Sequence, residues 1–210
     1  MAFDDDGFLD DYEIKELIDR FESQLENDRL SFFDADELNI IIDYYIQHDD
    51  FNKINVIADM AERYHSESPL YNAIMAKKYL SVQDAVAAMK YLKSDDNNFE
   101  DPDYYVNLGY AHSLLLEHEE SIEAYKKALK LFNKENCDDI YSSIGIEYMM
   151  MFQYEPALKY LIKGLKGSPD IYEQYIEITN CFFFLDRSDE AIEFFTKEID
   201  NNPYSIAAWM

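Results

Sequence analysis

Four histidines and two cysteines are the side chains of this chain whose chemistry could support catalysis or metal binding. The histidines are scattered: His48, His65, His112 and His118. His112 and His118 are six residues apart, a spacing that turns them away from a common face of a helix. Cys137 and Cys181 form no CxxC pair, so we expect free thiols rather than a disulfide framework or a zinc site.

The sequence carries no motif that defines an enzyme active site. GxSxG, HExxH, GxGxxG and a Gly-rich phosphate loop are all absent from the 210 residues. Four carboxylates near the N-terminus have the spacing of a calcium loop: Asp4, Asp6, Asp10 and Glu13. No helix can precede this segment, so a solvated acidic terminus is the favoured interpretation. We therefore predict a non-enzymatic protein with no catalytic residue, no cofactor and no metal.

The strong negative charge limits the classes of partner. A net charge of -26 repels phosphate backbones and anionic lipid headgroups, which disfavours nucleic acids and membranes as partners. A basic protein, a cationic peptide or a divalent ion would be attracted, although acidic charge can also serve only to keep an aromatic-rich chain soluble. The sequence has neither a segment apolar enough to span a membrane nor a signal peptide, which predicts a cytoplasmic location.

The elements that would position any site are helices. Five Gly, five Pro and 48% hydrophobic residues fit a nearly all-helical protein, which we expect to form one elongated domain. Apolar residues at spacings of three and four predict helices around residues 14–25, 38–45 and 54–61, and two further helices at about 70–80 and 83–92. The Asp- and Asn-rich run at 94–102 is the clearest loop, and it separates an irregular half from a regular one.

The second half is self-similar at the length of a helical hairpin. Tyr141, Tyr175 and Trp209 recur 34 residues apart, as do Ala157 and Ala191. A fixed period of this size is typical of stacked helix-turn-helix repeats. In such an array each repeat buries its apolar face against its neighbours and leaves an extended surface exposed.

Residues 102–203 resemble three tetratricopeptide repeats. That 34-residue pattern has large residues at positions 4, 7, 11 and 24, small residues at 8, 20 and 27, and Pro at 32. The fullest match counts from Asp138: Tyr141, Ile144, Gly145, Tyr148, Tyr154, Ala157, Leu161, Gly164 and Pro169. The segment counted from Pro102 supplies Tyr105, Leu108, Gly109, Tyr125 and Ala128, and the segment counted from Tyr172 supplies Tyr175, Ile178, Phe182, Ala191, Phe195 and Pro203. The first segment departs from the pattern with Ser121 at position 20 and with His112 at position 11, which we interpret as a partly buried core histidine.

This resemblance implies an all-α fold, a right-handed superhelical α-solenoid of antiparallel helix hairpins. It divides the chain into four parts: an acidic N-terminus and capping helix (1–30), two degenerate hairpins (31–101), three repeats (102–203), and the first turn of a further, truncated repeat (204–210). Residues 31–45 also resemble the N-terminal part of long acidic bacterial tetratricopeptide repeat proteins. The apolar end of such an array needs a cover, either more of a longer protein or a second copy.

The resemblance also predicts a binding surface, because the first helix of each hairpin lines the concave face of these arrays. The candidate partner-binding residues are Tyr110, Ser113, Leu114, Ile146, Met149, Met150, Ile176, Asn180, Phe183 and Phe184. The family's carboxylate clamp uses Lys, Asn and Arg at positions 5, 9 and 13. This chain has Val, Ser or Ile at position 5 and Leu, Met or Phe at position 13, so binding of acidic chaperone tails is disfavoured. An aromatic and Met-rich groove could instead accept an amphipathic helix, or these residues could pack against a further helix or a second copy.

The leading hypothesis is a protein-protein interaction scaffold that binds a peptide or an amphipathic helix of a partner protein along the concave face. One alternative is a self-associating structural array. Another is a regulatory helper domain of a larger protein.

Overall fold

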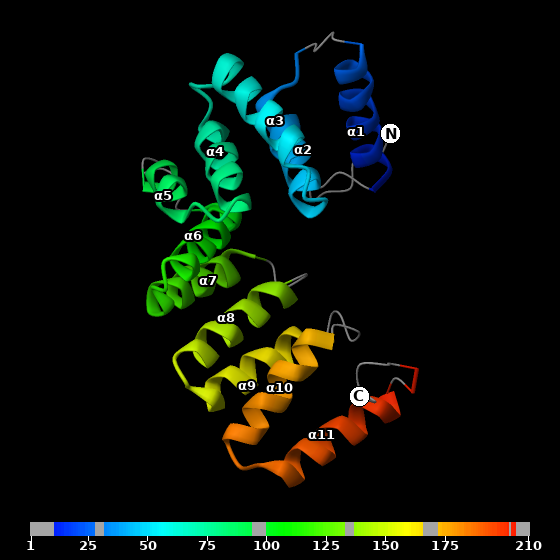
Figure 1. The fold of residues 1–210 in the computed structure, drawn as a ribbon, viewed down its shortest axis with the longest axis vertical. Coiled ribbons are helices and arrows are strands. Elements are labelled where there is room, and N and C mark those ends of the chain that lie inside the picture. The colour runs from blue at the N-terminus through cyan, green and yellow to red at the C-terminus, as the bar shows by residue number, and fades with distance from the viewer. Residues whose placement is uncertain are drawn as a thin grey trace. The chain divides into compact units, whose positions relative to one another are not determined.

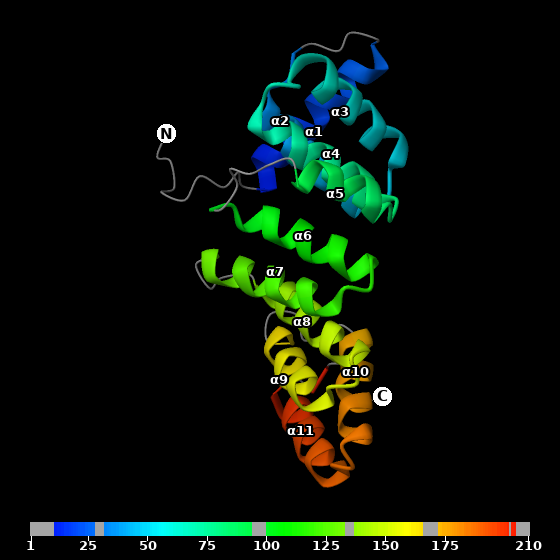
Figure 2. The same cartoon turned by 90° about the vertical axis from the view of Figure 1, so that its left-hand side faces the viewer.

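The computed structural model describes residues 11–27, 32–93, 100–132, 137–165, 172–201 and 203–204. Within these ranges the chain forms eleven α-helices and no strand, which confirms the all-α class (Figures 1 and 2). The chain divides into two compact units, Met1–Asn97 and Asn98–Met210. The boundary between the two units falls inside the Asp- and Asn-rich run that the sequence predicts to be a loop.

The first unit contains five helices: α1 (Asp11–Glu26), α2 (Ala35–Gln47), α3 (Phe51–Tyr64), α4 (Pro69–Ser81) and α5 (Ala85–Lys93). Helices α2 and α3 form one hairpin and α4 and α5 another, while α1 packs on α2. The predicted helices of this half are therefore confirmed. The core is one apolar cluster contributed by α1 to α4, and Phe21, Phe33 and Tyr45 are in ring contact within it.

Local sequence signals explain where these helices begin. The Asp34 carboxylate accepts a hydrogen bond from the backbone N–H of Glu37, and the Glu37 carboxylate accepts one from the N–H of Asp34, a capping box that starts α2. Ser68 caps α4, whose first residue is Pro69. Proline is suited to that position because its missing N–H would have no helical partner there.

The second unit contains six helices: α6 (Pro102–Leu114), α7 (His118–Leu131), α8 (Asp138–Met150), α9 (Tyr154–Gly164), α10 (Tyr172–Phe184) and α11 (Ser188–Asn201). They form three hairpins, α6–α7, α8–α9 and α10–α11, and neighbouring hairpins contact each other through α7 with α8 and α9 with α10 (Figure 1). A stack of antiparallel hairpins is the architecture of an α-solenoid. The exact repeat boundaries stay a prediction, and residues 1–10 and 205–210, which include the truncated repeat, lie outside the described residues.

Small residues inside the hairpins allow the paired helices to approach closely. A Cβ atom added to Gly145 would lie 2.6 Å from Cγ of Leu161 and 3.1 Å from its backbone N. One added to Gly109 would lie 2.7 Å from the ring of the buried Tyr125. Positions 8 and 24 of the repeat therefore meet in both hairpins, as the sequence pattern requires.

The departure from the pattern at Ser121 has a physical reason in the structure. Ser121 is fully buried, and its hydroxyl donates a hydrogen bond of 2.9 Å to the carbonyl oxygen of Gly109 in the paired helix. This bond satisfies a buried polar group that an apolar environment would otherwise penalise. Ser121 thus keeps the small size that position 20 needs and links α6 to α7.

All five hairpins share the same turn between their helices. One residue in each turn has a left-handed backbone with φ between 53° and 61°: Asp49, Gln83, Leu116, Phe152 and Asp186. In the α6–α7 turn, the N–H of Leu116 donates to the carbonyl of Ser113 and the N–H of Glu117 donates to that of His112. This pattern is a Schellman motif, and the equivalent bonds recur in the other four turns. A non-Gly residue in this conformation costs about 1–2 kcal/mol.

We expect Gly145→Leu to lower the free energy of unfolding by roughly 1–3 kcal/mol, because the new side chain overpacks the contact with Leu161. Chemical denaturation measures the change. Lys159→Leu, on the exposed side of the paired helix α9, is the matched control and should change stability by less than about 0.5 kcal/mol. Equal stabilities of Gly145→Leu and wild type would contradict the packing described above.

Candidate functional site

The predicted partner-binding residues lie on the first helix of each hairpin in the second unit. Tyr110, Ser113 and Leu114 are on α6, Ile146, Met149 and Met150 are on α8, and Ile176, Asn180, Phe183 and Phe184 are on α10. Six of them are exposed: Tyr110, Met150, Ile176, Asn180, Phe183 and Phe184. The other four are half-buried.

Two of the half-buried residues contribute to packing as well as to this surface. Ile146 and Met149 contact the apolar cluster formed by α9 and α10, which includes Leu161 and Ile178. Sequence spacing predicted the face on which they lie, but the approach of α10 determines how much of each side chain is covered. They join the hairpins together, and the remaining exposed residues form the accessible part of the surface.

Aromatic contacts organise the α10 end of this surface. The ring of Phe184 stacks on Tyr154 at the start of α9, with ring centroids 4.5 Å apart and planes at 12°. The rings of Phe183 and Phe184 meet edge to face at 5.4 Å. Phe183 is 75% exposed, whereas its neighbour Phe182 is 5% exposed and belongs to the core. Phe184 therefore has a packing partner within the chain, and Phe183 points to solvent.

A half-buried carboxylate adds negative charge to α10. Burial, reinforced by the charge of Glu173 one turn earlier, raises the pKa of Glu177 above its ordinary value. Burial also raises the pKa of the Cys181 thiol to about 11, with a smaller contribution from Glu177. At neutral pH Cys181 is thus a protonated thiol, which makes it a packing residue rather than a nucleophile.

The four histidines do not gather at one place. Nδ1 of His112 lies 2.6 Å from a carboxylate oxygen of Glu117, and Nδ1 of His118 lies 2.6 Å from one of the buried Glu147. His48 and His65 contact backbone carbonyl oxygens of the first unit. The interpretation of His112 as a partly buried histidine is confirmed. Cys137 and Cys181 are both buried, and they form no disulfide with each other.

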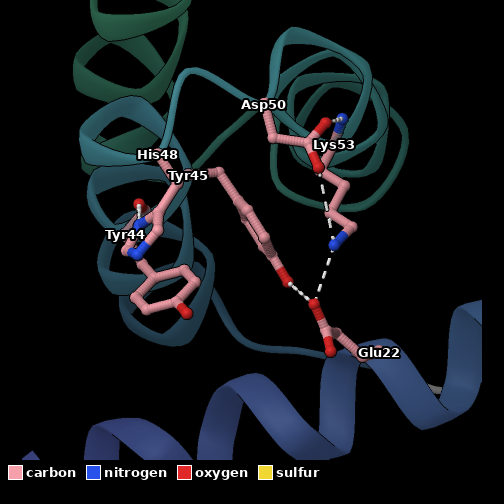
Figure 3. Close-up of polar contacts among 6 residues, drawn as sticks. All are labelled: Glu22, Tyr44, Tyr45, His48, Asp50 and Lys53. Atoms are coloured by element: carbon pink, nitrogen blue, oxygen red, sulfur yellow. Dashed lines mark hydrogen bonds and ion pairs between the residues drawn. The ribbon is translucent and has the colours of Figure 1, made fainter.

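A polar network in the first unit joins α1 to the α2–α3 hairpin (Figure 3). A carboxylate oxygen of Glu22 accepts hydrogen bonds from the Tyr45 hydroxyl at 3.1 Å and from Nζ of Lys53 at 2.7 Å. Lys53 also lies 3.5 Å from Asp50, and its Nζ lies 4.6 Å from the centre of the Tyr45 ring. Asp50 in turn caps α3 through the backbone N–H of Lys53.

The pKa shifts of the groups in this network indicate a structural role, which is to hold α1 on the α2–α3 hairpin. The hydrogen bond to Lys53 holds the pKa of Glu22 below its ordinary value, and the same bond raises the pKa of Lys53. Burial, with the nearby charge of Glu22, raises the pKa of Tyr45 as well. All three groups thus keep their ordinary neutral-pH forms, whereas a general acid or base needs a pKa near the operating pH.

Neither a metal cluster nor a membrane span is present in the part of the chain that the structure describes. No three His, Cys, Asp or Glu side chains within that part come together as metal ligands. The calcium-loop spacing at Asp4, Asp6 and Asp10 lies outside the described residues. None of the described helices has the length and hydrophobicity to cross a bilayer.

Comparison with known proteins identifies the class of this fold. Residues 102–135 match the family model for the tetratricopeptide repeat. The chain is similar to the crystal structure of MamA at 21% identity, covering 81% of this chain and 95% of that one with a TM-score of 0.61. It is similar to YrrB, described as a TPR protein with an unusual peptide-binding site, at 15% identity, with 93% and 97% covered and a TM-score of 0.58.

A third similar structure is the APC/C hetero-tetramer Cut9-Hcn1, at 16% identity, 94% coverage of this chain, 38% coverage of that one and a TM-score of 0.70. No curated protein sequence matches. The similarity to these solved structures shows the fold, which is a helical-repeat solenoid. Residues 102–135 are thus recognised as a tetratricopeptide repeat, as the residues counted from Pro102 predicted.

Two exposed apolar residues in the hairpin turns, Leu116 and Phe152, are not among the residues predicted from the sequence. Leu116 is 76% exposed and Phe152 is 78% exposed, and both have the left-handed backbone of the shared turn. The signal in the sequence was available, because each is the fifteenth residue of its segment counted from Pro102 or Asp138. The repeat pattern given above does not include that position, and the backbone conformation shows how unusual these residues are there.

We expect Glu22→Gln to lower the melting temperature at pH 7 and to have a smaller effect in acid. The pKa of Glu22 is lowered in the folded protein, so its stabilising contribution is present above the unfolded-state pKa and is lost as pH falls through the folded value. Thermal denaturation between about pH 7 and pH 3 measures the difference. Glu26→Gln, an exposed position on α1, is the control, and a loss at Glu22→Gln that is independent of pH would contradict the ionic account.

We expect Glu177→Gln to raise the melting temperature at neutral pH. The pKa of Glu177 is raised in the folded protein, so the wild type loses stability as pH rises through that pKa, and a neutral amide removes this cost. The gain should vanish in acid, where the wild-type carboxyl is protonated. Glu123→Gln on the exposed face of α7 should show no such gain at any pH, and a stability loss at Glu177→Gln would contradict the assignment.

Proposed function

We propose that this protein is a non-enzymatic scaffold that binds a peptide or an amphipathic helix of a partner protein along the face formed by α6, α8 and α10. This proposal rests on the exposed apolar side chains of these helices, which include Met150, Ile176 and Phe183. The resemblance to tetratricopeptide repeats predicts that this face is concave. Exposed aromatic and Met residues of this kind supply large, adaptable contact area.

The stacking of Phe184 on Tyr154 supports this use of the surface. A ring that is already held by a neighbouring helix loses little conformational entropy when a partner covers it. Phe183 contacts the edge of Phe184 and so extends the held ring towards solvent. Together these two residues provide a preorganised anchor on α10, and Met150 adds a flexible exposed side chain on α8.

Charge points to a basic or amphipathic partner. The chain has 44 acidic and 18 basic residues, and α10 carries Glu173 and the half-buried Glu177. A cationic segment would be attracted before contact, and the attraction would weaken with salt. The carboxylate clamp of the family is not reproduced, because Val106, Ser142 and Ile176 occupy its lysine position. A partner's acidic C-terminal tail is therefore disfavoured.

The exposed face of α11 favours a second candidate function, self-association. Not one residue of this helix is fully buried, and Ile192 is exposed among half-buried Phe194, Phe195 and Ile199. A second copy that packs on α11 would cover this apolar face. Sedimentation over a concentration series distinguishes the two functions, because a protein that remains monomeric throughout would eliminate self-association.

We expect Phe183→Ala to weaken capture of a partner and to change the free energy of unfolding by less than about 0.5 kcal/mol, because the ring is exposed. The matched control is the adjacent Phe182→Ala, which should cost about 3–5 kcal/mol because that ring is buried. Affinity capture at low and moderate salt, with denaturation of each variant, measures both effects. Unchanged capture by Phe183→Ala together with a large stability loss would identify Phe183 as a packing residue and contradict the proposal.

A further inference from the structure

The hairpin turns of the second unit form a surface separate from the helix face of the proposed function. The turns α6–α7, α8–α9 and α10–α11 lie along one edge of this unit, at the left in Figure 1. Each turn presents its left-handed residue at the same point of the Schellman motif. In chain order along the edge these residues are Leu116, Phe152 and Asp186.

The residue types in two of these turns are not explained by folding. Gly, Asn and Asp adopt the left-handed conformation at least cost, and Asp49 and Asp186 follow that preference. Leu116 and Phe152 are unfavourable there, and they are 76% and 78% exposed, so burial within this chain does not compensate for the strain. A covering partner would compensate, because it would remove both side chains from water.

Carboxylates surround the two apolar tips. Beside Leu116 lie the exposed Glu117, Glu119 and Glu120, and beside Phe152 lies Glu155. The Asp186 turn is followed by two more acidic groups, Asp189 and Glu190, at the start of α11. Arg187 in the same turn pairs with Glu155, at 2.8 Å, and with Glu190, so it partly neutralises these two carboxylates. The edge thus combines two apolar anchors with a strongly negative border.

We propose that this hairpin-turn edge is a docking surface for a cationic amphipathic helix of another protein, whose apolar face covers Leu116 and Phe152 and whose Lys or Arg residues meet the carboxylates around them. A second copy of this chain would bring the same carboxylates to the edge and a further net charge of -26, so like-charge repulsion disfavours it.

The spacing of the anchors suits a helix. Helix α6 packs on α7 and α7 on α8, so the two turns are separated by at most two helix spacings, roughly 20 Å in total. A helix rises 1.5 Å per residue, so about 13 residues span this distance. The occupant is therefore a helix of three to four turns, with one apolar contact near each end.

Two synthetic peptides of about 18 residues test the proposal, each built from Leu and Lys. In the first the Leu residues fall at helical spacing on one face, and in the second the same residues are scrambled so that no apolar face exists. Fluorescence anisotropy measures the binding of each to the full chain. We expect the amphipathic peptide to bind, and the double variant Leu116→Asn/Phe152→Asn to weaken that binding by about tenfold or more.

The melting temperature of the double variant distinguishes a docking role of these two side chains from a structural role. Asparagine tolerates the left-handed conformation, so the double variant should melt at the same temperature as wild type or higher. Gln83→Asn, at the equivalent turn position of the first unit, is the matched control and should leave peptide binding unchanged. A drop in melting temperature with unchanged binding would identify the two side chains as structural and overturn the proposal.

The remaining outcomes also decide between explanations. If Phe183→Ala abolishes peptide binding and the turn variant does not, the peptide occupies the helix face, which supports the proposed function and overturns docking at the edge. Equal binding of the scrambled peptide would mean that charge alone suffices, and it would overturn the role of the apolar anchors. Dimerisation of wild type that the turn variant removes would identify a second copy as the occupant and overturn the cationic helix.

Discussion

The paired helices α6–α7 and α8–α9 approach closely because a glycine lies at each contact. Gly145 faces Leu161, and Gly109 faces the ring of Tyr125, at distances that leave no room for a methyl group. Each pairing buries a large side chain against a neighbouring backbone, which combines apolar burial with dense packing. Ser121 preserves the same close approach and adds a buried hydrogen bond to it. The hairpin is the unit of stability, and the exposed surfaces follow from how the hairpins stack.

Stacking leaves one helix of each hairpin with a face that the chain covers only in part. On α8, Ile146 and Met149 are half-covered by the next hairpin, while Met150 remains open. On α10 the Tyr154–Phe184 stack holds one ring and leaves Phe183 exposed. In the first unit the contact between elements is polar: Glu22 and Lys53 form an ion pair that holds α1 on the α2–α3 hairpin. Ionised groups in that network stabilise the fold, whereas the apolar groups Met150 and Phe183 on α8 and α10 are exposed.

The turn between paired helices is a second repeated constraint, and it acts on backbone conformation. All five turns use one left-handed residue and the same pair of hydrogen bonds, in the degenerate first half as well as in the regular second half. Asp49 and Gln83 therefore show that the first two hairpins obey the geometry of the later three, even where their side chains depart from the repeat pattern. Leu116 and Phe152 stand out within this shared geometry, since Asp49 and Asp186 adopt it at lower cost in two of the other turns.

The sequence by itself determined the all-α class, the helices of both halves and the close contacts at Gly109 and Gly145, because small and large residues recur at the period of a hairpin. It also indicated which face of α6, α8 and α10 the candidate residues share, since helical periodicity sets the face. Only the tertiary structure decided how far Ile146 and Met149 are covered, that Glu22 meets Tyr45 and Lys53, and that Leu116 and Phe152 stand exposed in strained turns. The division into two units was likewise decided by the structure. These features depend on contacts between residues distant in the chain and on backbone angles, which a residue pattern does not encode.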